Sequence, residues 1–199
     1  MGVGGLGRSR RFLEDEFADL DIRIAANQAI DEITPGEIRL AGGGGLPFKL
    51  AMFAPPFKGV RGVAALGNPR GFIPVDDHYR HPDHANIYAV GVAIALAPPE
   101  PTQVPTGVPK TGFMTVRMAK AAAANIAADI QNVPPSRQKE LGVVCFMDMG
   151  RTAALMVADP ILPPRQRSYI KKARWAKWAK IGFEKYFLWK MRHGHARLP

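Results

Sequence analysis

The sequence is poor in cysteine, and Cys145 is the only one among 199 residues. A single thiol cannot form a disulfide within the chain, and it cannot supply the sulfur ligands of a zinc cluster. Long apolar segments are also missing: we find no run of about 18 apolar residues of the kind that crosses a bilayer as a helix. The first residues lack the apolar core of a signal peptide. These absences favour a protein that is soluble or lies on a membrane surface.

Acidic residues are scarce at one end of the chain. Residues 1–164 hold 16 Lys and Arg against 16 Asp and Glu, whereas residues 165–199 hold 11 basic residues against Glu184 alone. The net charge of +10 therefore comes from the last part of the chain. Such a segment is attracted to an anionic surface, either nucleic acid or phospholipid. With 47% hydrophobic and 9% aromatic residues, the chain has enough apolar material for a folded core.

Apolar spacing predicts three helices. "RRFLEDEFADL" has Phe12, Leu13, Phe17 and Leu20 at helical intervals, which indicates a helix over about residues 9–20. "MTVRMAKAAAANIAADIQ" is rich in alanine and predicts a second helix with a face suited to close packing. We expect the segment 168–192 to form the third helix.

Shorter apolar stretches predict strands. "DIRIAANQAIDEIT" indicates a strand before a turn at "TPGE", and two short strands flank the four-glycine loop at residues 42–45. "NIYAVGVAIAL" is a nearly continuous apolar run, typical of a strand buried on both faces of a parallel sheet. Further strands are predicted for "GFIPV", "LGVVCFMDMG" and "ALMVADPILPPR".

The opening residues "GVGGLG" match G-x-G-x-x-G through Gly2, Gly4 and Gly7. A dinucleotide-binding turn of this type follows a strand, and no strand precedes Gly2 in this sequence. We therefore expect a tight structural turn here, and no pyrophosphate cradle.

Three groups of motifs, taken in order, resemble the C-terminal portion of the sulfide:quinone oxidoreductases. These are "NPRGFIPVDDHYRHPDHANIYAVGV" with "VPTGVPKTGFMTVRMAKAAAANIAADI", then "VVCFMDMG…ADPILPPR", then "KWAKIGFEKYFLWKMRHG". The resemblance covers nearly the whole chain and implies a flavoprotein with FAD as cofactor. It also implies that an N-terminal flavin half, with two further functional cysteines, is not part of this sequence.

The resemblance places four residues near the flavin. Gly91 would bring backbone close to the ribityl chain, and Gly91-Val92 in place of Gly-Asp favours the sulfide branch over NADH oxidation. Val92 itself is expected to be an ordinary buried strand residue. Lys110, Thr111 and Gly112 would lie at the amino end of the alanine-rich helix, where free N–H groups stabilise negative charge. From the residues alone, Thr111 is equally an N-cap and Lys110 a solvated lysine.

By the same resemblance, Cys145 is the catalytic cysteine beside the flavin, and its redox partner would come from the half that is not in this sequence. Read without the family, a lone cysteine is a small buried hydrophobe. The quinone would be bound by Phe183 and Lys180, facing Val144 and Phe146 beside the cysteine.

The last predicted helix carries Trp175, Trp178, Tyr186 and Trp189 along one broad face. Aromatic rings settle at the headgroup level of a bilayer while lysines reach its phosphates, so this face predicts association with a membrane surface. Nucleic-acid binding through charge alone is the weaker alternative, and we expect no nucleic-acid partner.

The five histidines do not form a convincing metal site. His81 and His84 have a suggestive spacing, but they sit in a polar segment with Pro82 and Asp83. We interpret His78, His81, His84, His193 and His195 as surface residues and expect no metal.

The predicted fold class is α/β: a partial two-domain, Rossmann-like FAD/NAD(P)-binding flavoprotein with a C-terminal amphipathic, membrane-associating helix. Residues 1–70 would form part of the second dinucleotide-binding-like domain, residues 71–135 the returning part of the FAD domain, and residues 136–199 the quinone and membrane region.

The predicted function is electron transfer from sulfide through cysteine and flavin to a membrane quinone, by a peripheral membrane protein that is inactive as this chain alone. The expected partners are sulfide, quinone, a membrane surface, and either a separate N-terminal half or a second copy. The alternatives are a non-catalytic membrane-binding remnant and part of an NADH:quinone oxidoreductase-like flavoprotein.

Overall fold

A computed structural model describes residues 8–54, 57–97, 107–108, 110–150, 152–161 and 165–195. The glycine motif at residues 2–7 lies outside the described residues, so its interpretation as a structural turn stays a prediction.

The N-terminal region agrees with the helix and hairpin expected from the sequence. α1 spans Arg8–Asp19, and β1 (Ile30–Thr34), β2 (Glu37–Leu40) and β3 (Gly45–Pro47) form an antiparallel sheet. The glycine loop joins β2 to β3, and Gly43 and Gly44 adopt φ values of 89° and 88°. Glycine adopts such angles without steric cost, which explains the loop's composition. Residues 22–29, which the sequence assigned partly to a strand, contain none.

The middle of the chain differs from the prediction. "NIYAVGVAIAL" is not one buried parallel strand: β5 (His84–Tyr88) pairs antiparallel with β4 (Arg80–His81), and a 3₁₀ turn follows at Gly91–Ala93. Gly91 has a φ of 67°, which interrupts extended backbone. Val92 on that turn is 69% exposed, so its predicted burial is wrong. In place of the predicted strand "GFIPV", Ile73 forms a single parallel bridge with Ile94.

The alanine-rich helix is confirmed as α2 (Gly112–Ile130). The Thr111 side chain caps it by accepting a hydrogen bond from the Met114 N–H. One face carries the residues Met114, Met118, Ala122, Asn125 and Ala128, all of which are buried. Their spacing of three and four residues gives the helix one packed side.

The C-terminal region forms a second antiparallel sheet with a helix against it. β6 (Val143–Asp148), β7 (Ala153–Asp159) and β8 (Arg167–Ala173) are joined in that order, and α3 (Arg174–Arg192) follows β8 directly. The helix predicted over 168–192 is therefore wrong in its first part, because residues 168–173 pair with β7 along their whole length. α3 itself is about 28 Å long at 1.5 Å per residue, shorter than the predicted segment.

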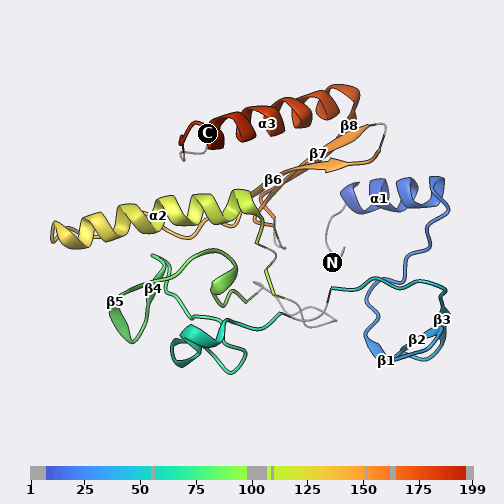
Figure 1. Cartoon of the computed structure of the whole chain (residues 1–199), viewed down its shortest axis with the longest axis horizontal. Coiled ribbons are helices and arrows are strands. Elements are labelled where there is room, and N and C mark those ends of the chain that lie inside the picture. Colours follow the sequence, from blue (N-terminus) through green and yellow to red (C-terminus); the bar gives the residue numbers. More distant parts are fainter. Residues whose placement is uncertain are drawn as a thin grey trace.

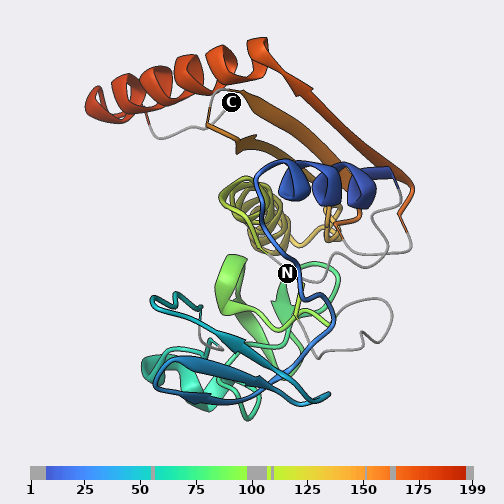
Figure 2. The same cartoon turned by 90° about the vertical axis from the view of Figure 1, so that its right-hand side faces the viewer.

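The sheet β6–β7–β8 lies between α3 on one side and α1 and α2 on the other (Figures 1 and 2). α1 contacts β8, where Glu16 forms an ion pair with Lys172 at 2.6 Å. The main hydrophobic core joins α2 to this sheet and to the middle of the chain through Ile73, Tyr79, Ile94, Met114, Met118 and Val143. Within the described ranges, every strand pair is antiparallel apart from the Ile73–Ile94 bridge. The mixed helix and sheet class is confirmed, and the Rossmann-like sheet and the three-part domain division stay predictions.

Asn125 ties α2 to two loops from inside the core. Its buried side-chain amide donates to the carbonyls of His78 and Arg137, at 2.9 and 2.8 Å, and accepts from the Arg137 N–H. A buried polar group that loses its partner costs about 1–3 kcal/mol.

We predict that Asn125→Ala lowers the free energy of unfolding by about 3 kcal/mol in urea denaturation, since it leaves three backbone groups unpaired. Gln131→Ala, at an exposed position one residue after α2, is the matched control and should change it by less than about 0.5 kcal/mol. Equal effects of the two substitutions would contradict this account.

Candidate functional site

Cys145 lies in the middle of β6, opposite Met156 of β7. Side chains alternate along a strand, so Val143 and Cys145 share one face of the sheet and Val144 and Phe146 share the other. The Cys145 face packs on the hydrophobic core that includes Met114 of α2. The predicted thiol and the predicted quinone-contact residues therefore occupy opposite faces of one strand.

Burial controls the state of the thiol. Desolvation raises the pKa of Cys145 above its ordinary value, and the positive charge of Lys180 opposes that rise. The net direction is upward, so the neutral thiol is the main form at neutral pH. A thiolate at this position needs additional positive charge from outside the described residues.

Asp148, at the end of β6, gathers two lysines of α3. Its carboxylate accepts hydrogen bonds from the ammonium groups of Lys177 and Lys180, each at 2.9 Å, and from the Gly150 N–H at 3.0 Å. These bonds hold the pKa of Asp148 well below its usual range. The sequence analysis did not select Asp148. The sequence pattern that could have indicated it is an aspartate three residues after Cys145, followed by a helix with two lysines three residues apart.

α2 begins at Gly112, with Thr111 as its N-cap and Lys110 one residue earlier. The Thr111 hydroxyl binds the Met114 N–H, and the Thr115 N–H donates to the Thr111 carbonyl at 2.9 Å. In the described structure this leaves the N–H groups of Gly112 and Phe113 for an external acceptor. A Cβ on Gly112 would meet nothing within 4 Å, so the backbone is open there.

Lys110 is half-buried just before this helix. Its ammonium lies 5.6 Å from the centre of the Phe72 ring, and burial lowers its pKa. The interpretation of Lys110 as a fully solvated lysine is therefore wrong, because part of its hydration is replaced by protein.

Gly91 is buried against the first turn of α2. A Cβ at this position would lie 2.7 Å from the Thr115 methyl group, and the φ of 67° also favours glycine. The close approach of this turn to α2 is therefore sufficient to explain why position 91 is a glycine.

β6, which carries Val144, Cys145 and Phe146, contacts both α2 and α3. Phe183 is half exposed on α3, and its ring stacks on Phe187 with centroids 6.2 Å apart. The aromatic side chains predicted to meet a membrane are between 45% and 74% exposed: Trp175, Trp178, Tyr186 and Trp189.

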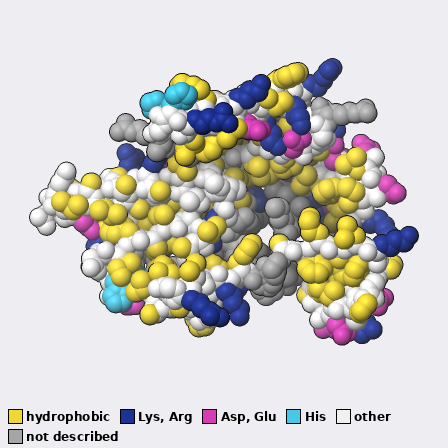
Figure 3. Space-filling view, in the orientation of Figure 1, with side chains coloured by type: hydrophobic (Ala, Val, Ile, Leu, Met, Phe, Trp, Pro, Cys, Tyr) yellow, Lys and Arg dark blue, Asp and Glu magenta, His cyan; other side chains and the backbone are white. Residues whose placement is uncertain are grey.

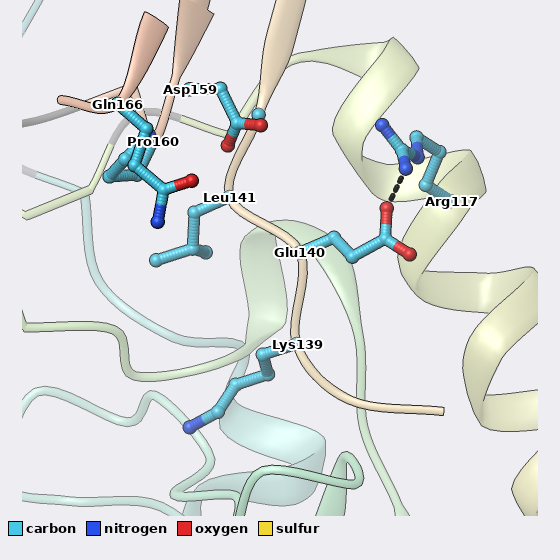
Figure 4. Close-up of a pocket in the computed structure, with 8 residues that line it drawn as sticks. Arg117, Lys139, Glu140, Leu141, Asp159, Pro160 and Gln166 are labelled. Carbon is cyan, nitrogen blue, oxygen red and sulfur yellow. Dashed lines mark ion pairs between the residues drawn. The ribbon is translucent and has the colours of Figure 1, made fainter. Parts of the chain in front are cut away.

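A separate polar cavity of about 380 Å³ lies beside the start of β6. Figure 4 shows Arg117 of α2 in an ion pair with Glu140 at its edge. Its lining contains none of the residues that the sequence predicted: Arg117, Lys139, Glu140, Leu141, Gly142, Asp159, Pro160 and Gln166. Three of its charged side chains already form ion pairs, Arg117 with Glu140 and Lys139 with Asp77, so the cavity offers no strong ligand signal.

The prediction that all five histidines are surface residues is wrong for His81. His81 is buried, not a surface residue: its Nδ1 accepts from the Asp83 N–H and its Nε2 lies 3.1 Å from the Leu66 carbonyl.

The described residues hold no cluster of three potential metal ligands. Among them there is also no helix long and apolar enough to cross a bilayer.

Comparison with known proteins identifies the relationship. The chain is 42% identical to the sulfide-quinone reductase of Aquifex aeolicus over 98% of its own length and 47% of that protein. It matches the X-ray structure of the sulfide:quinone oxidoreductase from Aquifex aeolicus with a TM-score of 0.86 and 42% identity, covering 98% of this chain and 48% of the other. The chain is therefore similar, in sequence and in fold, to about half of a sulfide:quinone oxidoreductase.

The predicted resemblance to the C-terminal portion of that family is thus confirmed. The chain spans about half the length of the curated relative it matches. A weaker likeness, with a TM-score of 0.55 and 14% identity, joins it to a chain of the mitochondrial ATP synthase tetramer of Tetrahymena thermophila. It covers 77% of this chain and 37% of the other, and it concerns the fold alone. No protein-family model matches the chain.

The raised pKa of Cys145 can be tested through the pH dependence of its alkylation. Alkylation by iodoacetamide requires the thiolate, so its rate should follow a titration whose midpoint lies above the ordinary cysteine pKa. We predict a low rate at pH 7 that still rises at pH 9. In urea, where burial is lost, the midpoint should fall to the ordinary value. A midpoint below that of the unfolded chain would contradict the assigned burial.

Proposed function

We propose that this chain supplies the quinone-side and membrane-side part of an FAD-dependent sulfide:quinone oxidoreductase, which oxidises sulfide and reduces a membrane quinone. The observation that carries the proposal is 42% identity over 98% of the chain to a sulfide-quinone reductase. The whole enzyme would be a two-domain, Rossmann-like flavoprotein, and its flavin half would correspond to the part of the relative that this chain does not cover.

The residues at the start of α2 suit FAD. The free N–H groups of Gly112 and Phe113, the open space over Gly112 and the ammonium of Lys110 form an electropositive end of a helix. Such a position stabilises negative charge that develops on a bound group. FAD, when bound, supplies two-electron chemistry. Gly91 lets the preceding turn approach α2 closely and so sets the position of this helix end.

Cys145 would be the sulfur-handling residue. Sulfide would attack a disulfide between Cys145 and a cysteine outside this chain, forming one S–S bond and breaking the other. One cysteine would leave this step as a persulfide and the other as a thiolate, and that thiolate would be the electron-pair donor to bound FAD. Because this is the chain's single cysteine, the second cysteine of a redox pair would come from the half of the enzyme that this chain does not cover. A cation from outside the described residues would then have to lower the pKa that burial raises.

The opposite face of β6 would bind the quinone. Val144 and Phe146 offer apolar contact beside the cysteine, Phe183 offers an aromatic ring, and Lys180 offers a donor to a quinone oxygen. These groups come from β6 and from α3, which contact each other.

α3 would hold the enzyme on a membrane surface. Trp175, Trp178, Tyr186 and Trp189 are exposed, and the surrounding segment is strongly basic. Aromatic rings at the headgroup level combined with basic side chains produce binding that depends on anionic lipid. This arrangement favours peripheral association over nucleic-acid binding.

Exposed apolar surface also supports contact with the half of the enzyme that this chain does not cover. In the loop after β3, Leu50, Met52 and Phe57 are 90%, 98% and 72% exposed. Hydrophobic side chains also lie along the visible sides of α2 and of the β1–β3 sheet (Figure 3). Monomeric soluble proteins rarely leave patches of this kind uncovered.

Reconstitution tests the proposal. We predict that the chain, mixed with the part of the Aquifex relative that it does not cover, yields a complex with yellow flavin absorbance and sulfide-dependent quinone reduction. Cys145→Ser should lower that rate by about a hundredfold or more, because the nucleophilic sulfur is lost. Asp83→Asn, in the exposed turn between β4 and β5, is the control and should keep the rate. A flavin complex with an undiminished Cys145→Ser rate would rule out the assigned role.

Membrane association has its own test. We predict that the chain sediments with vesicles containing anionic phospholipid, and that Trp178→Ala weakens this binding about fivefold because a 74% exposed indole is lost. Met52→Ala removes a more exposed apolar side chain from a loop outside α3 and should leave binding unchanged. Retention of the chain on DNA that disappears with salt, without vesicle binding, would favour the nucleic-acid alternative.

A further inference from the structure

The last turn of α3 holds a lysine that is buried without an acidic partner. Lys190 is 7% exposed, whereas the other lysines of this helix lie at intermediate or exposed positions. Lys177 and Lys180 bind Asp148, but among the residues that the structure describes no carboxylate pairs with Lys190. Its ammonium lies 5.9 Å from the centre of the Tyr186 ring, one helical turn earlier. Burying a lysine is costly unless an anion or other acceptors replace the lost water, and an aromatic ring replaces only part of it.

Three further rings extend this contact around the C-terminal end of α3. The Tyr186 ring stacks on that of Trp189, with centroids 6.3 Å apart. The rings of His193 and His195 lie 4.8 and 6.1 Å from the Trp189 ring. The turn after the helix is held in place, because the N–H groups of His193 and His195 donate to the Lys190 carbonyl at 3.2 and 3.0 Å. We call these five residues the α3 terminal cluster, and Figure 3 shows its histidines at the molecular surface.

The cluster borders the aromatic face that the proposed function assigns to the membrane. Tyr186 and Trp189 belong to both, and they are 45% and 52% exposed. Lys190 lies about four helical turns after the buried Ala176, so its backbone is on the buried side of α3. Its ammonium nevertheless reaches the Tyr186 ring, at the edge of the exposed face. A lysine in this position can bury its stem in protein and present its charge at the headgroup level of a bilayer.

Acidic side chains are scarce around the cluster. Residues 165–199 hold 11 basic residues and Glu184 as their single acid. Glu184 and Lys190 are six positions apart, a spacing that does not bring side chains together on a helix. An anion for Lys190 would therefore come from outside this segment. The neighbouring exposed rings favour a lipid as its source, because tyrosine and tryptophan settle at the headgroup level.

We propose that Lys190 is the centre of a binding site for the phosphate headgroup of an anionic phospholipid, at the C-terminal end of α3. The ammonium donates to a phosphate oxygen, and the rings of Tyr186 and Trp189 contact the lipid beside it. This inference rests on the proposed membrane association of α3 and deepens it, since it assigns the anionic lipid to one residue and not to the whole basic segment. A charge-assisted hydrogen bond at a partly dehydrated site is strong and is screened little by salt.

Sedimentation of the full chain with vesicles tests the assignment. The vesicles contain phosphatidylcholine, with or without phosphatidylglycerol, and the salt is low or high. We expect Lys190→Met to weaken binding to the anionic vesicles by about tenfold at about 0.1 and about 0.5 M NaCl, because a charge-assisted hydrogen bond is lost. Lys185→Met removes the same charge from an exposed position of the same helix and is the matched control. Its effect should be at most about fivefold at low salt and vanish at high salt, where exposed charges are screened.

Three outcomes of this experiment would overturn the proposal. Equal effects of Lys190→Met and Lys185→Met at high salt would assign the binding to diffuse charge. An equal loss of Lys190→Met binding to vesicles of phosphatidylcholine alone would indicate damaged packing. Displacement of the natural chain by excess glycerol phosphate, at constant ionic strength, would assign the site to soluble phosphate esters. A natural chain that binds no vesicle at all would overturn the membrane part of the proposed function as well, whereas failed reconstitution with the expected vesicle results would overturn only the electron-transfer part.

A fluorescence measurement keeps Lys190 in place and so provides the test if Lys190→Met is unfolded by circular dichroism. In a chain with Trp175→Phe and Trp178→Phe, Trp189 is the single tryptophan. A spin label on phosphatidylglycerol should quench its fluorescence about twofold more strongly than the same label on phosphatidylcholine at equal mole fraction, because the anionic lipid gathers beside Lys190. Equal quenching by the two labelled lipids would contradict a headgroup site in the α3 terminal cluster.

Discussion

The packing of α3 on the β6–β7–β8 sheet is the interaction on which the candidate site depends. Ala153 on β7 and Ala176 on α3 are fully buried, and α3 contacts all three strands. Ala153 lies opposite Asp148 in the strand register, so the two residues share the face that bears the Asp148–lysine cluster. Small side chains let a helix lie close to a sheet, and this closeness brings Lys177 and Lys180 within reach of the carboxylate.

This packing divides the chemistry of β6 between two surfaces. Cys145 faces the core that α2 helps to build, whereas Val144 and Phe146 face the side of α3. One strand can thus present sulfur to a cofactor on one side and apolar contacts to a quinone on the other. The exposed tryptophans of α3 would bring that second side to the lipid surface, where quinones dissolve.

Elements with strong local signals could be predicted from the sequence. The spacing of Phe12, Leu13 and Phe17 indicated α1, and the alanine-rich stretch indicated α2, because helix propensity and periodicity are local properties. The strand at residues 168–173 was missed because its partner, β7, supplies the pairing from elsewhere in the chain. The resemblance selected Cys145 and Lys180, but Asp148 became visible only when the register of β6 and the position of α3 were known. The flavin and lipid contacts depend on groups outside the chain, so neither sequence nor fold fixes them.

The most direct test of the account is where a quinone binds. A photoreactive quinone, irradiated with the reconstituted complex on vesicles and mapped by mass spectrometry, should label β6 and α3 around Val144, Phe146 and Phe183. Labelling should fall when unmodified quinone competes. Competed labelling confined to other segments, such as the exposed loop after β3, would contradict the claim that the contact between β6 and α3 forms the quinone site.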